Sequence, residues 1–351
     1  MPQQQPPHPM VKYMQELELY TQWTDSPLMQ LMSRVGPQLE KVTMFRGQLA
    51  SGTCLQALAC YWPRLTQLRL GYHNVTLDSM VAIAQHCPHL RDLLFFRCRH
   101  LSSNLFTPFV EAAAANDRCA RLEKIDLITA GEDPPWTYQT VLDLAQFPMM
   151  TSFTINARPA LIQDLLTTVI WPHLTHLELD CIVEMGRDDD DDDDGSGDAL
   201  VIPFLQKHCQ LKCVSLLAMS ITNATLDAMA TYLPDITGLD LRGNACLTVR
   251  GVRRLVRQSR HVAWVDLLGC NISSSEFPEA YYELDLDDPS IDSELYLDPD
   301  GVDEIQRIGP QGIYDDDDDD DNNDDDDDDE IWLRLWQRSF INLRLYGSGV
   351  A

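Results

Sequence analysis

The sequence predicts an α/β solenoid, a curved array in which every repeat contributes one parallel strand and one helix. Three apolar residues recur along the chain, with two residues between the first pair and one between the second. The pattern occurs ten times, at Met14-Leu17-Leu19, Leu39-Val42-Met44, Leu65-Leu68-Leu70, Leu90-Leu93-Phe95, Leu122-Ile125-Leu127, Met150-Phe153-Ile155, Leu174-Leu177-Leu179, Leu211-Val214-Leu216, Ile236-Leu239-Leu241 and Val262-Val265-Leu267. The middle residues are separated by 25, 26, 25, 32, 28, 24, 37, 25 and 26 positions. A nearly fixed period in the twenties is typical of stacked copies of one strand–helix unit.

Proline residues mark the approach to the strand in six of the ten copies. They stand two residues before the first apolar position, at Pro37, Pro63, Pro88, Pro148, Pro172 and Pro234. Proline cannot continue a helix and disfavours helical angles in the residue before it, so each proline is expected to separate a helix from the next strand. Apolar residues at helical spacing, as in Leu58-Ala59-Trp62, precede the prolines. We therefore expect about 10–11 leucine-rich repeats, with a parallel concave sheet and convex helices.

Three segments share a more specific pattern. They are VTLDSMVAIAQHCPHLRDLLFFRC (75–98), ITNATLDAMATYLPDITGLDL (221–241) and LTVRGVRRLVRQSRHVAWVDLLGC (247–270). These segments resemble the cysteine-containing leucine-rich repeat of F-box/leucine-rich-repeat proteins, whose solenoids are of the RNI-like type, and the resemblance covers roughly residues 11–275. In such repeats the residue three positions after the strand, here Cys98, Asn244 or Cys270, points inward and satisfies backbone groups in the loop.

The resemblance implies a role in substrate recognition or as an adaptor in ubiquitin-ligase pathways. In that family the repeats capture a target protein, and an N-terminal F-box helix bundle docks on a cullin–RING ligase. In this sequence the first repeat begins near Val11. No F-box is therefore expected ahead of the repeats, and the partners implied are a protein target and ligase subunits.

The net charge of −29 is concentrated in two acidic segments. Residues 276–330 hold 26 acids and one base, and residues 188–198 hold eight acids and no base, which leaves 21 acids and 25 bases elsewhere. Runs of like charge repel one another and bury no apolar surface, so both segments are expected to be disordered.

Both acidic segments interrupt the repeat pattern at the same point, the loop from strand to helix. Without residues 188–198 or 276–330, the distances between flanking copies return to a normal repeat, and Phe340-Leu343-Leu345 fits the strand pattern again. The sequence thus predicts a disordered tail at 1–10, a solenoid at 11–275 with the acidic loop 188–198, a disordered insertion at 276–330, and a C-terminal repeat or cap at 331–351.

The concave sheet surface supplies the first candidate binding site. Its more interactive members are expected to be Phe45, Arg46, Arg69, Tyr72, Phe96, Arg97, Trp264 and Arg344. Arginine and aromatic side chains dominate binding hot spots because they offer large contact areas and charge-assisted hydrogen bonds. The alternative is that these residues only reflect the aromatic and charged side chains that any solenoid face exposes.

A helix predicted at 250–260 carries five arginines and no acid, namely Arg250, Arg253, Arg254, Arg257 and Arg260. Such a helix is consistent with a nucleic-acid site. A solvated convex face is the favoured interpretation, and a contact with the acidic segment that follows in the sequence is a third. Nucleic acid is therefore not favoured as a partner.

Catalysis and metal binding are not expected. His208, Cys209 and Cys213 form the one tight cluster of metal-type ligands, but no Cys-x-x-Cys pair accompanies them. The sequence contains no phosphate-binding loop and no plausible catalytic triad, so we expect no cofactor and no enzyme activity. A secretory signal and a membrane-spanning run are also absent, which favours a cytoplasmic or nuclear protein with free thiols.

A second interpretation belongs to a different functional class. The acidic segments favour a leucine-rich chaperone or regulator that binds basic nuclear proteins such as histones, with the aspartate runs acting as a mimic of nucleic acid.

Overall fold

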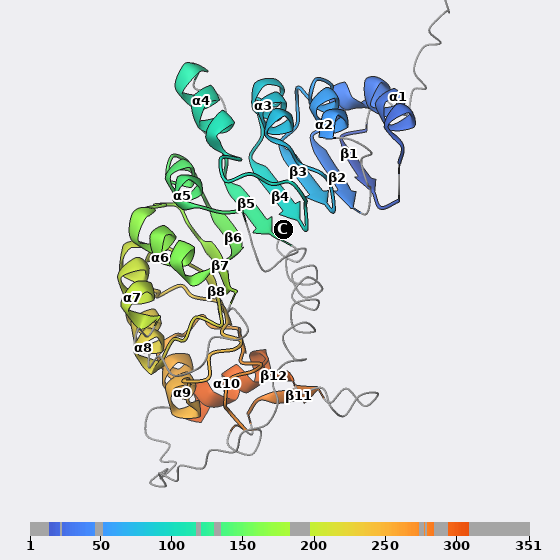
Figure 1. Ribbon diagram of the computed structural model, residues 1–351. Coiled ribbons are helices and arrows are strands. Elements are labelled where there is room, and N and C mark those ends of the chain that lie inside the picture. Colours follow the sequence, from blue (N-terminus) through green and yellow to red (C-terminus); the bar gives the residue numbers. More distant parts are fainter. Residues whose placement is uncertain are drawn as a thin grey trace, which may run out of the picture.

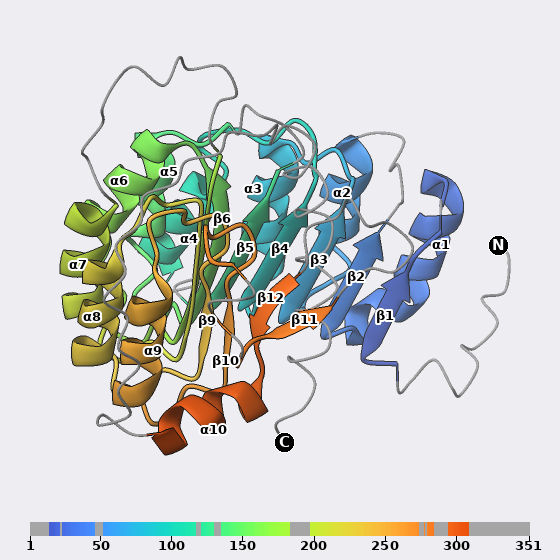
Figure 2. The ribbon, with the colours of Figure 1, turned by 90° about the horizontal axis from the view of Figure 1, so that it is seen from below.

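The computed structural model describes residues 14–21, 23–45, 52–116, 121–129, 135–182, 197–273, 277, 279–283 and 294–308. In this part of the chain the strands form one curved sheet on the inner side of an arc, and the helices line its outer side (Figure 1). The first ten strands lie side by side in chain order, as Figure 2 shows. The predicted α/β leucine-rich-repeat solenoid is confirmed.

Ten strands pair in parallel, each with its sequence neighbours. They are β1 (Glu16–Leu19), β2 (Lys41–Phe45), β3 (Gln67–Gly71), β4 (Asp92–Phe96), β5 (Lys124–Ile128), β6 (Ser152–Ala157), β7 (His176–Cys181), β8 (Cys213–Leu217), β9 (Gly238–Asp240) and β10 (Trp264–Asp266). Two more strands, β12 (Glu294–Leu297) and β11 (Tyr281–Glu283), complete the sheet beyond β10.

The outer layer is built from one helix per repeat. The helices are α1 (Asp25–Val35), followed by the 3₁₀ turn η2 (Gly36–Gln38), α2 (Gly52–Ala59), α3 (Leu77–His86), α4 (Thr107–Asn116), α5 (Tyr138–Leu144), α6 (Pro159–Thr168), α7 (Asp198–Lys207), α8 (Asn223–Tyr232), α9 (Val249–Gln258) and α10 (Pro299–Ile308).

The middle residues of the predicted pattern form one continuous apolar row through the core. Val42 pairs with Leu68, Leu68 with Leu93, and the register continues in the same way from β5 to Val265 of β10. These side chains are 0–2% exposed between β2 and β10. Because each repeat buries its apolar residues only against its neighbours, this register holds the whole array together.

The prolines have a specific role in the turn that leads into each strand. In the third repeat the amide of Leu65 donates to the carbonyl of Trp62 across 3.2 Å, and Pro63 lies between them. The same bond recurs from Leu90 to Cys87 and from Ile236 to Leu233. Proline at the second position of such a turn has its φ already set, so the helix ends and the chain enters the strand at a fixed point.

The residue three positions after the third apolar residue of the pattern satisfies loop carbonyls, as the resemblance implies. The Cys98 thiol donates to the carbonyl of Leu70 across 3.4 Å, and the Cys270 thiol donates to Leu241 across 3.2 Å. Asn244 does more, because Nδ2 donates to Leu216 and Leu241 while Oδ1 accepts from the amide of Met219. Burial raises the pKa of both thiols to about 12, so they stay protonated as donors.

The C-terminal end of the array corrects a sequence prediction. Part of the expected disordered insertion at 276–330 is ordered, because β12 pairs antiparallel with β10 and β11 pairs antiparallel with β12. These strands take the sheet edge at which the sequence predicts the repeat from 331–351, a segment that lies outside the described residues. The high acid content hid a sparse apolar pattern whose members are all buried, namely Phe277, Leu295, Leu297, Val302 and Ile305.

Helix α10 covers the end of α9 in this cap. Gln306 Nε2 donates to the carbonyls of Val256 and Ser259, two groups at the end of α9 that have no partner within that helix. Arg253 of α9 forms a bidentate ion pair with Glu279, with N···O distances of 3.1 and 2.9 Å, and its guanidinium lies 5.3 Å from the centroid of the Phe277 ring. Both charged residues are less than 10% exposed.

The prediction that the acidic segment 188–198 is disordered is wrong for its last residue, Asp198. Asp198 is buried at the start of α7, and its carboxylate accepts hydrogen bonds from the Thr222 amide and from the Thr222 and Thr225 hydroxyls. It therefore ties α7 to α8 instead of belonging to a disordered loop. The rest of the run, like the predicted tail at 1–10, lies outside the described residues.

We predict that Arg253→Ala lowers the free energy of unfolding by about 3 kcal/mol, because Glu279 is left as a buried, unpaired carboxylate. Urea denaturation measures this loss. The matched control is Arg250→Ala on the same helix, which removes an exposed arginine and should change stability by less than about 0.5 kcal/mol. Equal effects of the two substitutions would contradict the role assigned to the cap.

Candidate functional site on the concave face

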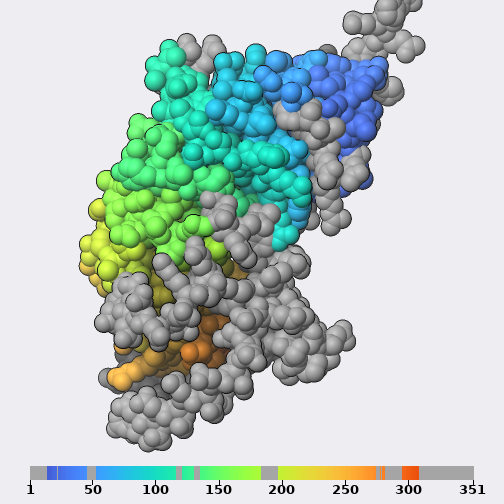
Figure 3. Space-filling view, viewed as in Figure 1, coloured from blue at the N-terminus to red at the C-terminus, as the bar shows by residue number. Residues whose placement is uncertain are grey.

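Every second residue of the strands faces away from the helices onto the concave side. Strand pairing aligns the middle ones into a central row, which reads Glu18, Thr43, Arg69, Leu94, Asp126, Thr154, Glu178, Ser215, Asp240 and Asp266. The row changes character along the arc, whose repeats follow one another as bands of colour in Figure 3. Its first part adjoins aromatic residues and its second part is acidic.

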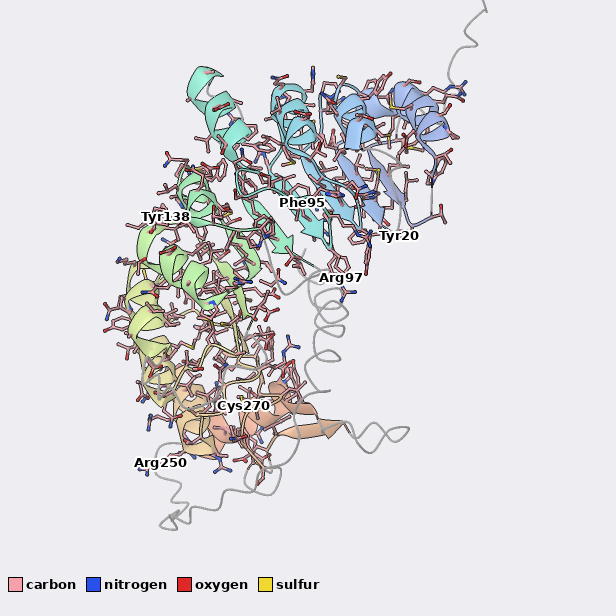
Figure 4. The ribbon with its side chains drawn as sticks, in the orientation of Figure 1. Tyr20, Phe95, Arg97, Tyr138, Arg250 and Cys270 are labelled. Carbon is pink, nitrogen blue, oxygen red and sulfur yellow. The ribbon has the colours of Figure 1, made fainter. Side chains whose placement is uncertain are left out.

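Four aromatic side chains gather at the N-terminal part of the concave face and form the aromatic cluster: Tyr20, Phe45, Tyr72 and Phe96. Phe45 lies 6.3 Å from Tyr20 and 6.0 Å from Phe96, and Tyr72 meets Phe96 edge-on at 5.2 Å, all measured between ring centroids. The Arg97 guanidinium lies 5.5 Å from the Phe96 centroid. In Figure 4 Tyr20 and Arg97 extend from the inner side of the arc, whereas Tyr138 lies on the outer side.

Glycine makes room for this packing. A Cβ atom on Gly71 would lie 2.3 Å from the Phe45 ring, so the ring rests directly over the backbone of β3. A glycine also makes room for an aromatic ring at the C-terminal part of the sheet, where a Cβ on Gly238 would lie 2.5 Å from the Trp264 side chain. Trp264 also stacks on Tyr296 of β12, with centroids 6.4 Å apart, so the cap extends this aromatic surface.

Tyr72 and Arg97 adopt a backbone conformation that L residues rarely take. Both have positive φ, 65° and 49°, at the position just after their strands. Ala218, Gly243 and Gly269 also have positive φ at the equivalent position in the repeats of β8, β9 and β10, so the conformation is a recurring feature of this turn. A bulky residue costs roughly 1 kcal/mol more than glycine in this conformation, and such strain tends to collect at binding sites. The two side chains are candidates for a functional role because both lie against the Phe96 ring on the concave face.

The structure brings together most of the concave residues predicted from the sequence. Phe45, Tyr72, Phe96 and Arg97 share the aromatic cluster and its edge, while Arg69 lies beside it and pairs with Asp92 at 3.2 Å. Trp264 stands apart at the other end of the sheet. The predicted residues Arg46 and Arg344 lie outside the described residues.

Sequence analysis missed the second half of the central row. Asp126, Glu178, Asp240 and Asp266 form the acidic row, on β5, β7, β9 and β10. The signal was available, because each of these acids stands between the second and third apolar positions of its copy. The segments at 188–198 and 276–330 hold most of the acids of the sequence and conceal these four single residues.

Burial and mutual repulsion act on the acidic row. Burial, together with the neighbouring carboxylates of Asp240 and Asp126, raises the pKa of Glu178 to about 8. Burial likewise raises the pKa of Asp126, although Lys124 opposes this shift from 3.4 Å. One guanidinium already sits at the C-terminal end of the row, where Arg242 Nε is 2.8 Å from Asp240 and 3.5 Å from Asp266.

The basic helix α9 does not present five free arginines. Arg253 is buried in the cap, and Arg254 pairs with Asp227 of α8 at 2.6 and 2.8 Å. Arg257 is half-buried, while Arg250 and Arg260 are exposed. Figure 4 shows Arg250 on the outer side of the arc. The prediction of a solvated convex face thus describes Arg250 and Arg260 and is wrong for Arg253.

His208 has a structural role between two repeats. Its Nδ1 lies 2.8 Å from the Phe204 carbonyl, and its Nε2 accepts from the Trp171 amide at 3.0 Å. Because one nitrogen must donate and the other accept, the ring is neutral, and burial lowers its pKa accordingly.

Comparison with known proteins supports the fold class. No protein-family model and no curated protein matches this sequence. A chain in the crystal structure of the Rad7–Elc1 complex from yeast is similar in structure, with a TM-score of 0.54 and 14% identity. The match covers 71% of this chain and 60% of that one, so this chain spans somewhat more than half of its length. An internalin (InlF) from Listeria monocytogenes matches with a TM-score of 0.45, 12% identity and coverage of 76% and 77%.

The described residues have the fold of a leucine-rich-repeat solenoid, and the similar yeast chain supports this assignment of the fold. Among the described residues, no helix combines the length and the hydropathy that a membrane crossing requires.

We predict that Glu178→Gln stabilises the protein by about 2 kcal/mol at pH 8.5 and has little effect below pH 4.5. Because its pKa is raised from 4.5 to about 8, Glu178 contributes stability at low pH that is lost as the pH rises through 8. Urea titrations of both proteins across this range measure the difference. A difference that stays constant with pH would contradict the raised pKa of this half-buried carboxylate.

Proposed function

We propose that this protein is a non-catalytic adaptor that captures a protein partner on its concave face and acts in a ubiquitin-ligase pathway. The observation that carries the proposal is the aromatic cluster with Arg97 at its edge. Aromatic rings and an arginine on a preformed surface are the groups that dominate protein–protein hot spots. Other repeats place Ala218, Gly243 or Gly269 at the position of Tyr72 and Arg97, so the fold does not require a large side chain there, which favours a binding role.

Two further features support the ligase pathway. The repeats resemble those of F-box/leucine-rich-repeat proteins, down to the carbonyl-binding Cys98, Asn244 and Cys270. The Rad7–Elc1 structure contains a chain of similar fold in complex with a second protein. We place the protein in the cytoplasm or the nucleus, where such ligases act on their targets.

A second candidate function is the binding of basic nuclear proteins such as histones. The acidic row favours it, because it adds carboxylates on the concave face to the aspartate runs in the sequence. This candidate differs from the first in its partner and its salt dependence, since exposed charges are screened at moderate ionic strength.

We predict that Arg69→Glu with Arg97→Glu weakens capture of the protein partner at least tenfold and leaves the thermal unfolding midpoint nearly unchanged. Affinity purification from cells, with cullin–RING subunits quantified, provides the readout. The control is Arg250→Glu with Arg260→Glu, which makes the same charge change on the convex side. If cullin–RING subunits are absent from the wild-type complex, the ligase role is wrong.

The second candidate predicts that histone binding depends on the acids at 315–330 and is lost near 0.3 M salt. We suggest exchanging these residues for glycine and serine at equal length, because deletion of the whole 276–330 segment would remove β11, β12 and α10. Histone pull-down measures the effect. Binding that persists in the exchanged protein would exclude the aspartate run as the determinant.

A further inference from the structure

We infer that the acidic row is a binding site for an extended, cationic segment of the partner protein, with its positive side chains spaced about 9–10 Å apart. This inference rests on the proposed use of the concave face for partner capture, and it names the chemistry of the segment that is captured.

The spacing follows from the strands that carry the acids. Asp126, Glu178 and Asp240 lie on β5, β7 and β9, so one strand separates each acid from the next. Neighbouring strands lie about 4.8 Å apart, which places successive carboxylates about 9.6 Å apart. Thr154 and Ser215 fill the positions between them on β6 and β8. The row therefore alternates carboxylate and hydroxyl groups along the arc.

Two groups in the row have unmet hydrogen-bonding capacity. Asp126 is only 6% exposed, and its Oδ1 has no hydrogen-bond partner within the described part of the chain. The buried Ser215 hydroxyl is in the same state. A buried carboxylate oxygen without a donor is costly, so a cationic donor that reaches Asp126 gains more there than at an exposed acid.

Arg242 shows that the row accepts a guanidinium. Its side chain is 8% exposed and contacts Asp240 and Asp266 on adjacent strands. No arginine or lysine of the described residues makes an equivalent ion pair with Glu178. Glu178 is thus the acid of the row at which a partner's cation can form a new ion pair, whereas Lys124 already approaches Asp126 at 3.4 Å.

The spacing also selects the conformation of the bound segment. A polyproline II chain rises about 3.1 Å per residue with three residues per turn, so every third side chain returns to the same side after about 9.3 Å. A segment with arginine or lysine at every third position therefore matches the row. In a run of consecutive arginines, only every third side chain points toward the row, and the others point away from it.

The test uses the full chain and two synthetic peptides of the same composition, measured by calorimetry at pH 7 and 0.15 M salt. In one peptide, Arg-Pro-Ala is repeated four times; in the other, the four arginines are consecutive. We expect the spaced peptide to bind at least fivefold more tightly. Because binding shifts Glu178 toward its ionised form, we also expect proton release, seen as a dependence of the heat on the buffer.

Matched variants locate the site. Glu178→Gln with Asp240→Asn should weaken the spaced peptide at least tenfold and abolish proton release. Glu111→Gln with Asp235→Asn removes two exposed acids outside the concave face and should leave the affinity for the spaced peptide unchanged. If the peptide bound the aspartate runs instead of the row, the two double variants would bind it with the same affinity. Equal affinities for the two peptides, or equal effects of the two variants, would overturn the inference.

The chain itself contains another occupant, because residues 331–346 carry Arg334, Arg338 and Arg344 and no acid. If the spaced peptide binds only after these arginines are changed to glutamine, the row serves the chain's own segment and the inference is wrong. Failure of the proposed function has a different signature, namely loss of ligase subunits from the wild-type complex while peptide binding persists.

Discussion

The in-register contact between apolar residues of successive repeats is the constraint on which this structure depends. One repeat cannot bury Leu68 or Leu93 alone, since each of these side chains is covered by the repeats before and after it. The proline turns and the carbonyl-binding Cys98 and Asn244 fix where each strand begins and how its loop closes. The concave face is regular because this register is regular, and a row of side chains can therefore become a spaced set of charges.

Much of the solenoid could be predicted from the sequence, because it rests on local periodicity. Leu177 and Leu239 lie on neighbouring parts of one sheet as their spacing predicts, and the role of Asn244 follows from its place after the strand. The cap could not be predicted in this way. Its antiparallel strands break the repeat, and Phe277 and Val302 are separated by too many acidic residues for a periodic signal to survive.

Only part of the candidate site could be predicted from the sequence, because the rest depends on tertiary contacts. Residue type pointed to Phe96 and Arg97, but the position of the Phe45 ring depends on Gly71, whose missing side chain carries no chemical signal of its own. The pairing of Arg253 with Glu279 likewise depends on tertiary contact, which turned an apparent surface charge into a buried one. The acidic row needed the residue between two apolar positions to be compared across repeats, and composition alone concealed it.

The attachment of the first aspartate run has a practical consequence. The strand before it ends at Cys181, and the amide of the next residue, Ile182, bonds to Ala157. The helix after it begins at Asp198, which is bonded to Thr222 and Thr225, and the preceding Gly197 is bonded to Ser220. Both junctions are thus fixed by neighbouring repeats, independently of what joins them. Doubling the length of such a connection costs only about 0.6 kcal/mol of closure entropy. This junction is therefore a permissive position for grafting a tag or reporter domain without disturbing the arc.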